Sequence, residues 1–228
     1  MKRFVFIVAA LAATASMQGQ EERRWSLDYE VGIGITRFFN YPAISLLEDN
    51  TPSYTAPTTA LTLGLRHDDG LSFGLRYSNT AINTANVAMQ EHATLHDFSL
   101  VVRRSAMLSQ RVELYGSATI GFAILHNSLV YNGNNLSQNR YGFSAGFEAG
   151  LRYYISDDTY FFVSAGLSAV NLTNVKKLPN PQTQNGLPSA HMTGGFGIGF
   201  PPKVKKLNMS HEIIERKEPL QMAYYTDD

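Results

Sequence analysis

The sequence contains no cysteine, which excludes disulfide bonds, thiolate metal sites, a cysteine nucleophile and a lipid-modified N-terminal cysteine. Its 228 residues include 19 basic and 19 acidic side chains. This balance argues against nucleic-acid binding, which calls for a basic patch or stripe. After the N-terminus there is no run of 18 apolar residues, so we expect no membrane-spanning helix.

The first 15 residues have the pattern of a secretory signal peptide. Lys2 and Arg3 form a basic start, Phe4–Ala13 is apolar, and Ala13-Thr14-Ala15 is an A-x-A cleavage site. The apolar stretch is too short for a membrane anchor, and polar residues follow it. We therefore expect export, with cleavage after residue 15 or as late as residue 19, and a short linker over residues 16–24.

The dominant pattern of the mature chain is the alternation of apolar residues with small or polar ones. It is clearest in Tyr141–Ile155, where Tyr141, Phe143 and every second residue after them are apolar. Similar alternation occupies residues 25–38, 61–66, 71–78, 97–103, 112–124, 161–168 and 192–200. Because successive side chains of a strand point to opposite faces, the pattern predicts eight strands, each with one apolar face.

The links between these segments alternate in length. Short links are expected near residues 68–70, 105–110 and 156–159, and long polar ones near 39–57, 80–91, 127–139 and 171–189. Outer-membrane barrels have short periplasmic turns, longer external loops and an even number of strands. We therefore expect a barrel over residues 25–200 with four external loops, both termini in the periplasm, and a periplasmic tail over residues 201–228.

Soluble alternatives fit the pattern less well. A lipocalin is also an eight-stranded barrel, but its outer face is solvated, and no predicted strand contains a lysine. A β-sandwich of eight strands of this length would be unusual. The sequence therefore favours an all-β fold, an eight-stranded antiparallel transmembrane barrel with up-and-down topology.

Nine charged residues share the polar parity of the strands and are expected to face the lumen. They are Asp28, Glu30, Arg66, Arg76, Asp97, Arg103, Glu113, Glu148 and Arg152. Eight strands enclose a space just wide enough for side chains to fill, and buried charges there must be paired. A salt-bridged plug is the favoured interpretation, and a narrow conduit in which these pairs exchange partners is the alternative.

Aromatic residues lie near the two ends of the apolar faces, where a membrane girdle is expected. They are Trp25, Tyr77, Phe122, Tyr141, Tyr153, Phe161 and Phe200.

The eight segments and the closing sequence Gly195-Phe196-Gly197-Ile198-Gly199-Phe200 resemble the small OmpA/OmpX-type outer-membrane barrels, in the version found as porin-family proteins in Bacteroidetes. The resemblance implies a closed, monomeric Gram-negative barrel with a structural, surface-interaction or adhesion role. It implies outer-membrane lipids and lipopolysaccharide as partners, and recognition of the closing strand by the barrel assembly machinery. Surface or periplasmic protein partners are also possible. It implies no enzymatic activity and no cofactor.

Two further hypotheses stay open. His126-Asn127-Ser128 resembles the His-x-Ser element of outer-membrane lipid A 3-O-deacylases, with Ser128 as nucleophile and His126 as base, but the nearest acid, Glu148, has luminal parity. A small-solute conduit or a secretion accessory is the other.

We expect no metal site, because His92 and His96 would lie about 13 Å apart along a strand. Lys176 and Lys177 are candidates for contact with lipopolysaccharide phosphates.

Overall fold

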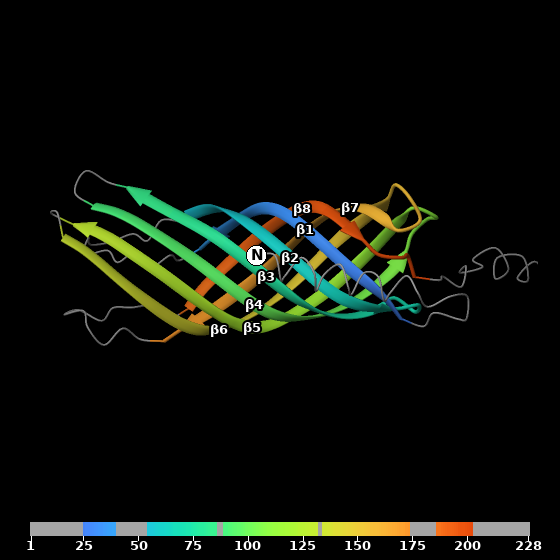
Figure 1. Ribbon diagram of the computed structural model, residues 1–228, viewed down its shortest axis with the longest axis horizontal. Helices are drawn as coiled ribbons and strands as arrows, with labels where there is room; N and C mark the ends of the chain where they lie inside the picture. Colours follow the sequence, from blue (N-terminus) through green and yellow to red (C-terminus); the bar gives the residue numbers. More distant parts are fainter. Residues whose placement is uncertain (1–24, 40–53, 86–88, 132–133, 174–185, 203–228) are drawn as a thin grey trace, which may run out of the picture.

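The molecule is a closed barrel of eight antiparallel strands (Figure 1). The computed structural model describes residues 25–39, 54–85, 89–131, 134–173 and 186–202. The strands are β1 (Trp25–Phe38), β2 (Tyr54–His67), β3 (Leu71–Ala85), β4 (Met89–Met107), β5 (Val112–Tyr131), β6 (Asn134–Tyr154), β7 (Thr159–Leu172) and β8 (Gly186–Ile198). Each strand pairs with its sequence neighbours, and β8 closes on β1. The predicted fold class and strand count are confirmed.

The two faces of the strands have the environments that the alternation predicts. Ile33, Phe143 and Phe147 point outward and are 72%, 76% and 74% exposed, whereas Arg66 and Arg152 point inward and are 1% and 0% exposed. This is the reverse of a water-soluble protein, in which charged side chains are almost never fully buried unless they are paired. No helix in the described ranges is long and apolar enough to cross a membrane.

Three tight turns connect neighbouring strands at one end of the barrel, which we call the turn end. The turn after β2 falls at the predicted Asp68–Gly70, where Gly70 has φ +88°. The Gly70 amide donates to the His67 carbonyl at 3.0 Å, and a Cβ at Gly70 would lie 2.3 Å from the Ser105 carbonyl oxygen. Glycine is required here because other residues rarely adopt positive φ. The other two turns span residues 108–111 and 155–158, a shift of a few residues from prediction.

The opposite mouth, the loop end, differs from the prediction. Residues 80–91 and 127–139 were expected to be loops, but β3 and β4 are separated only by residues 86–88, and β5 and β6 only by residues 132–133. Likewise, β2 already begins at Tyr54 and β8 at Gly186. The prediction was wrong because, past the outward apolar band, inward positions such as Ile82, Leu95 and Leu125 are apolar while the outward ones beside them are polar. The alternation that identifies the strands is therefore reversed there.

The hairpins β3–β4 and β5–β6 therefore project from the barrel. Figure 1 shows their tips extending well past β1, β2, β7 and β8 at one end. The closing strand ends two residues earlier than predicted, because β8 ends at Ile198 and Phe200 lies beyond it. The predicted signal peptide and linker, Lys176 and Lys177, and all but the first two residues of the predicted tail lie outside the described residues.

Candidate functional site in the barrel interior and at the rim

A balanced ionic cluster fills the lumen at the turn end. It brings together six of the nine charges predicted to face inward: Asp28, Glu30, Arg66, Arg103, Glu113 and Arg152. All six are buried, with exposed fractions of 5% or less. Three carboxylates oppose three guanidinium groups, so the cluster carries no net formal charge.

Arg152 lies at the centre of this ionic cluster. Its Nη2 is 2.8 Å from Asp28 Oδ2 and 2.6 Å from Glu30 Oε1, and its Nη1 is 3.2 Å from Glu113 Oε1. Arg103 binds Glu30 through two parallel hydrogen bonds of 2.9 Å. Charge-assisted bonds of this kind are stronger and more directional than neutral ones, so the cluster fixes β1, β4, β5 and β6 relative to one another.

Tyrosine side chains complete the ionic cluster. Tyr154 accepts a hydrogen bond from Arg66 at 2.7 Å and donates to Glu113 at 2.5 Å. Tyr160 donates to Asp28 at 2.5 Å. The Arg103 guanidinium lies 4.2 Å from the centre of the Tyr115 ring. These tyrosines were not predicted as part of the site, although their inward parity on β5, β6 and β7 was a signal that could have identified them.

The remaining three predicted charges lie elsewhere in the lumen. Arg76 Nη1 is 2.6 Å from Glu148 Oε2, and the same oxygen is 3.2 Å from Nε2 of His191, which the sequence analysis did not single out. Asp97 accepts hydrogen bonds from Ser99 and from Ser144 Oγ, the latter at 3.0 Å. Within the described ranges Asp97 forms no ion pair.

On the loop-end side of the ionic cluster, the lumen contains a small polar cavity of about 60 Å³. Its wall includes a row of hydroxyl groups in which Thr58 Oγ1 lies 2.7 Å from Thr36 Oγ1 and 2.9 Å from Thr80 Oγ1. This volume suffices for water but is far below the several hundred Å³ of a typical small-molecule site. We therefore assign no solute site to it.

The loop end of the lumen is filled by apolar side chains, which the sequence analysis did not predict. This apolar plug consists of Phe38, Ala56, Ile82, Ala93, Leu95, Ala123, Leu125, Val170, Leu172 and Leu187. Phe38, Ile82 and Leu187 are fully buried. All lie on inward-facing positions toward the loop end of their strands. Four of them, Ala56, Ile82, Leu172 and Leu187, fall in segments that were expected to be loops.

The predicted girdle residues all point outward. Trp25, Phe122, Tyr141, Tyr153, Phe161 and Phe200 are between 41% and 49% exposed, and Tyr77 is partly buried. Trp25 packs edge-on against His67 at the turn end, with ring centres 4.9 Å apart. Phe122 and Tyr141 stack toward the loop end, 6.1 Å apart.

The candidate His-x-Ser element lies on the outward face of β5, beyond the apolar band. His126 Nδ1 is 2.6 Å from the side-chain oxygen of Asn139, while Glu148 points into the lumen and binds Arg76 and His191. No carboxylate in the described part of the chain lies within hydrogen-bonding distance of His126. The structure thus separates the proposed acid from the proposed base. Nor does any described group of three or more acidic or histidine side chains have the arrangement of a metal site.

The sealed lumen, the lipid-exposed apolar faces and the short-turn, long-hairpin arrangement define a small outer-membrane barrel. The model of the outer membrane protein beta-barrel domain matches residues 4–200, and the chain belongs to this family.

Comparison with solved structures gives the same fold at low sequence identity. The chain is similar to Neisserial surface protein A (13% identity, TM-score 0.52), covering 79% of this chain and all of that one. It is also similar to Ail, the attachment invasion locus protein of Yersinia pestis (13% identity, TM-score 0.50, 78% of this chain and all of that one). Ail bound to the heparin analogue sucrose octasulfate gives 12% identity, a TM-score of 0.51 and the same coverage. No curated protein matches the sequence.

Proposed function

We propose that the protein is a closed outer-membrane barrel that contacts partners at the cell surface through its two projecting hairpins. In this proposal the loop end faces the exterior and both termini lie in the periplasm. The observation that carries it is the combination of a filled lumen with hairpins that project past the other strands at the loop end. A sealed interior leaves the rim as the part of the molecule available to partners.

The lengths of the strands support this role. β4, β5 and β6 have 19, 20 and 21 residues, whereas β1, β2 and β7 have 14 each. About 9–11 residues suffice for a tilted strand to cross a bilayer. The extra residues extend the wall β3–β6 outward as paired strands, which hold a binding surface more rigidly than loops do.

The projecting wall also has an edge that pairs on one side only among the described strands. β7 pairs with β6 only from Gly142 onward, so residues 134–139 of β6 are paired with β5 alone within the described ranges. Such an edge can add a further strand through main-chain hydrogen bonds, a common mode of peptide recognition. The outward face nearby is polar, with His92, His126 and Asn139 exposed.

The similar structures are of proteins named for the cell surface and for attachment. One is a surface protein, one is an attachment invasion protein, and the latter was solved with a heparin analogue. We extend this role to the present chain as a proposal. We further propose that it acts as a monomer surrounded by outer-membrane lipids and lipopolysaccharide. Its closing strand would be recognised by the barrel assembly machinery.

The test shortens both hairpins without touching the barrel. Asn83 pairs with His92 and Ser128 with Ser137, so residues 84–91 and 129–136 can each be replaced by the two-residue turn Asn-Gly. Cells displaying the shortened barrel should lose binding to immobilised heparin and to matrix proteins. The control is Arg111→Ala in an exposed turn-end position. Undiminished binding by the shortened barrel would refute the proposal.

Two measurements test the alternative functions. Planar-bilayer recordings of the purified barrel should show no steady conductance, because the ionic cluster and the apolar plug both block the lumen. Lipopolysaccharide incubated with the barrel should release no ester-linked acyl chain, because His126 is oriented by an amide and not by a carboxylate. Acyl release that Ser128→Ala abolishes would establish the deacylase function instead.

A further inference from the structure

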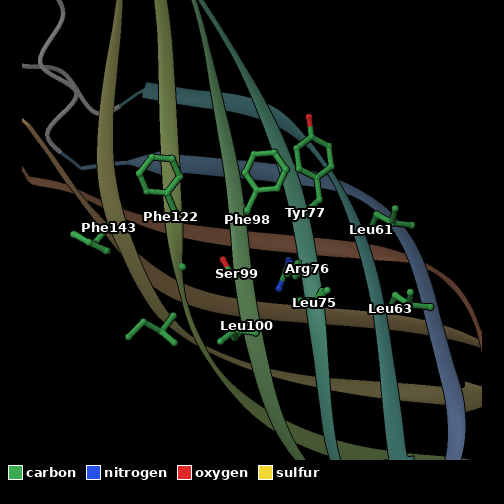
Figure 2. Close-up of a pocket in the computed structure, with 12 residues that line it drawn as sticks. Leu61, Leu63, Leu75, Arg76, Tyr77, Phe98, Ser99, Leu100, Phe122 and Phe143 are labelled. Atoms are coloured by element: carbon green, nitrogen blue, oxygen red, sulfur yellow. The ribbon is translucent and has the colours of Figure 1, made fainter. Parts of the chain in front are cut away.

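The outward surface of β2–β6 contains an apolar groove of about 590 Å³. Figure 2 shows the rings of Tyr77, Phe98 and Phe122 side by side on β3, β4 and β5, with Leu63, Leu75 and Leu100 one row closer to the turn end. We call this feature the lipid-side groove. It lies on the face that meets hydrocarbon in an outer-membrane barrel.

The register of the strands produces the groove. Tyr77 pairs with Phe98, and Phe98 with Phe122, so three rings align across neighbouring strands. Between this row and the leucine row lie residues that point into the lumen, such as Ser99. Only the backbone of these residues faces outward, so the surface is low between the row of rings and the row of leucines. The two rows of large side chains form the sides of a narrow groove, which an extended alkyl chain can fill.

A polar cluster borders the groove on its loop-end side. Tyr77 Oη lies 2.9 Å from His96 Nδ1, and the two rings stack with centres 6.1 Å apart. Asn79, which pairs with His96 across the strands, donates from Nδ2 to Tyr77 Oη at 3.4 Å. All three side chains face outward. The apolar groove and the hydrogen-bonding side chains are therefore adjacent. This arrangement suits a lipid, whose apolar acyl chain is joined to a polar headgroup.

The apolar band is narrow at this position. On β4 the outward residues Phe98, Leu100 and Val102 are apolar, but His96 precedes them and Arg104 follows, with its side chain 63% exposed. On β6 the outward apolar run extends from Tyr141 to Ile155. A short apolar stretch thins the adjoining bilayer, which brings lipid headgroups toward the Tyr77–His96 pair.

We propose that the lipid-side groove binds one acyl chain of a lipopolysaccharide molecule, whose sugar or phosphate oxygens are held by His96, Tyr77 and Asn79. The choice of lipopolysaccharide rests on the orientation proposed above, which places the loop end in the outer leaflet. The continuity of the groove with the lipid-exposed apolar face identifies the occupant as a membrane lipid. The adjoining imidazole, phenol and amide provide the hydrogen bonds for its head.

The test measures lipid retention by native mass spectrometry of the full chain in detergent, titrated with lipid A or with phosphatidylethanolamine. We expect one lipid A molecule to remain bound, with phosphatidylethanolamine at least tenfold weaker. The double variant Tyr77→Phe, His96→Ala should weaken lipid A binding about tenfold, the effect of losing about two hydrogen bonds. Leu100→Trp, which fills the groove, should abolish retention.

Matched controls change the same residue types away from the groove. Tyr153→Phe removes the phenol hydroxyl of an outward residue at the turn end of β6, and Leu167→Trp enlarges an outward residue on β7. Both should retain lipid A like the unaltered barrel, and a heat-dependent gel shift verifies that every variant is folded. Equal retention by the groove variants and these controls overturns the site.

The lipid preference separates this inference from the proposed orientation. If phosphatidylethanolamine binds as well as lipid A, the assignment to lipopolysaccharide is wrong. If groove variants lose lipid while the shortened hairpins leave surface binding intact, the lipid site stands and the adhesion role fails. If groove variants retain lipid A while the shortened hairpins abolish surface binding, the lipid site is rejected and the adhesion role stands.

Discussion

The two ends of the lumen close the same barrel by opposite chemistry. At the turn end, six charges form a cluster in which Arg152 contacts three carboxylates within 3.2 Å. At the loop end, Ile82, Leu125 and other apolar side chains exclude water with no directional bond. Breaking an ionic cluster leaves an uncompensated buried charge, whereas trimming an apolar plug leaves a cavity. The ionic end therefore specifies which strands adjoin, and the apolar end only fills space.

Replacement of Arg152 by methionine should produce the largest loss of stability. It leaves three buried carboxylates opposed by two guanidinium groups, and breaking a buried ion pair costs about 3–5 kcal/mol. The free energy of unfolding can be measured by urea titration in lipid vesicles with the single tryptophan, Trp25, as the fluorescent probe. Arg104→Met, in an exposed pair with Asp69, is the control and should cost less than about 1 kcal/mol. If Arg152→Met and Arg104→Met lowered the free energy of unfolding equally, the buried ion pairs would contribute no more stability than the exposed pair.

Replacement of Ile82 by alanine should have the next largest effect. Ile82 is fully buried in the apolar plug, and truncation there costs about 3 kcal/mol from lost transfer energy and the cavity left behind. Ile33→Ala on the lipid-facing side, where lipid can fill the space, should cost less than half as much in the same titration. If Ile33→Ala is as costly as Ile82→Ala, the loop end is not packed as a core.

Between the two ends, Thr58→Val should have an intermediate effect. Thr58 links the hydroxyls of Thr36 and Thr80, and its loss leaves both without this partner at a cost of about 1–2 kcal/mol. Unfolding of the purified variant measures it, with Thr59→Val on the outward face as the control. A neutral Thr58→Val would show that water in the neighbouring cavity replaces the missing hydroxyl.

The smallest effect is expected at Asp69, in the exposed turn beyond the ionic cluster. The Leu71 amide, the His67 side chain and Arg104 hold the pKa of the Asp69 carboxyl well below its usual value. A lowered pKa contributes stability above the unfolded-state pKa, near pH 4, and that contribution is lost as the pH falls through the folded value. Unfolding midpoints from pH 7 to pH 3 should therefore fall slightly less for Asp69→Asn than for the unaltered chain. A steeper fall for the variant would contradict this.

Period-two alternation was sufficient to predict the fold and, within the apolar layer, the inward direction of charged side chains such as Glu30 and Arg103. Glu30 and Arg103 were both expected to face inward, and the structure places both there. Their mutual pairing could not be predicted, because it crosses the lumen between β1 and β4 and depends on the shear of the closed barrel rather than on neighbouring strands.

The apolar plug and the projecting hairpins were missed for a related reason. Leu125 and Ile82 occupy inward positions where polar residues were expected, while the outward residues next to them, such as His126 and Asn83, are polar. Without a bilayer on one side, the alternation no longer encodes the direction of a side chain. Sequence period therefore predicts the strands only within the apolar layer.

Closure of the barrel joins the two ends of the chain, since residues 29–38 pair with residues 189–198. The other seven seams join consecutive strands and can form locally during folding. Asp28 and Glu30, on β1, are bonded to Arg152 across sequence separations of 124 and 122 residues. These contacts can form only when β1 and β6 lie on opposite sides of a nearly closed barrel. The ionic cluster therefore stabilises the product of the last folding step, and its strength should determine the rate at which the folded barrel unfolds.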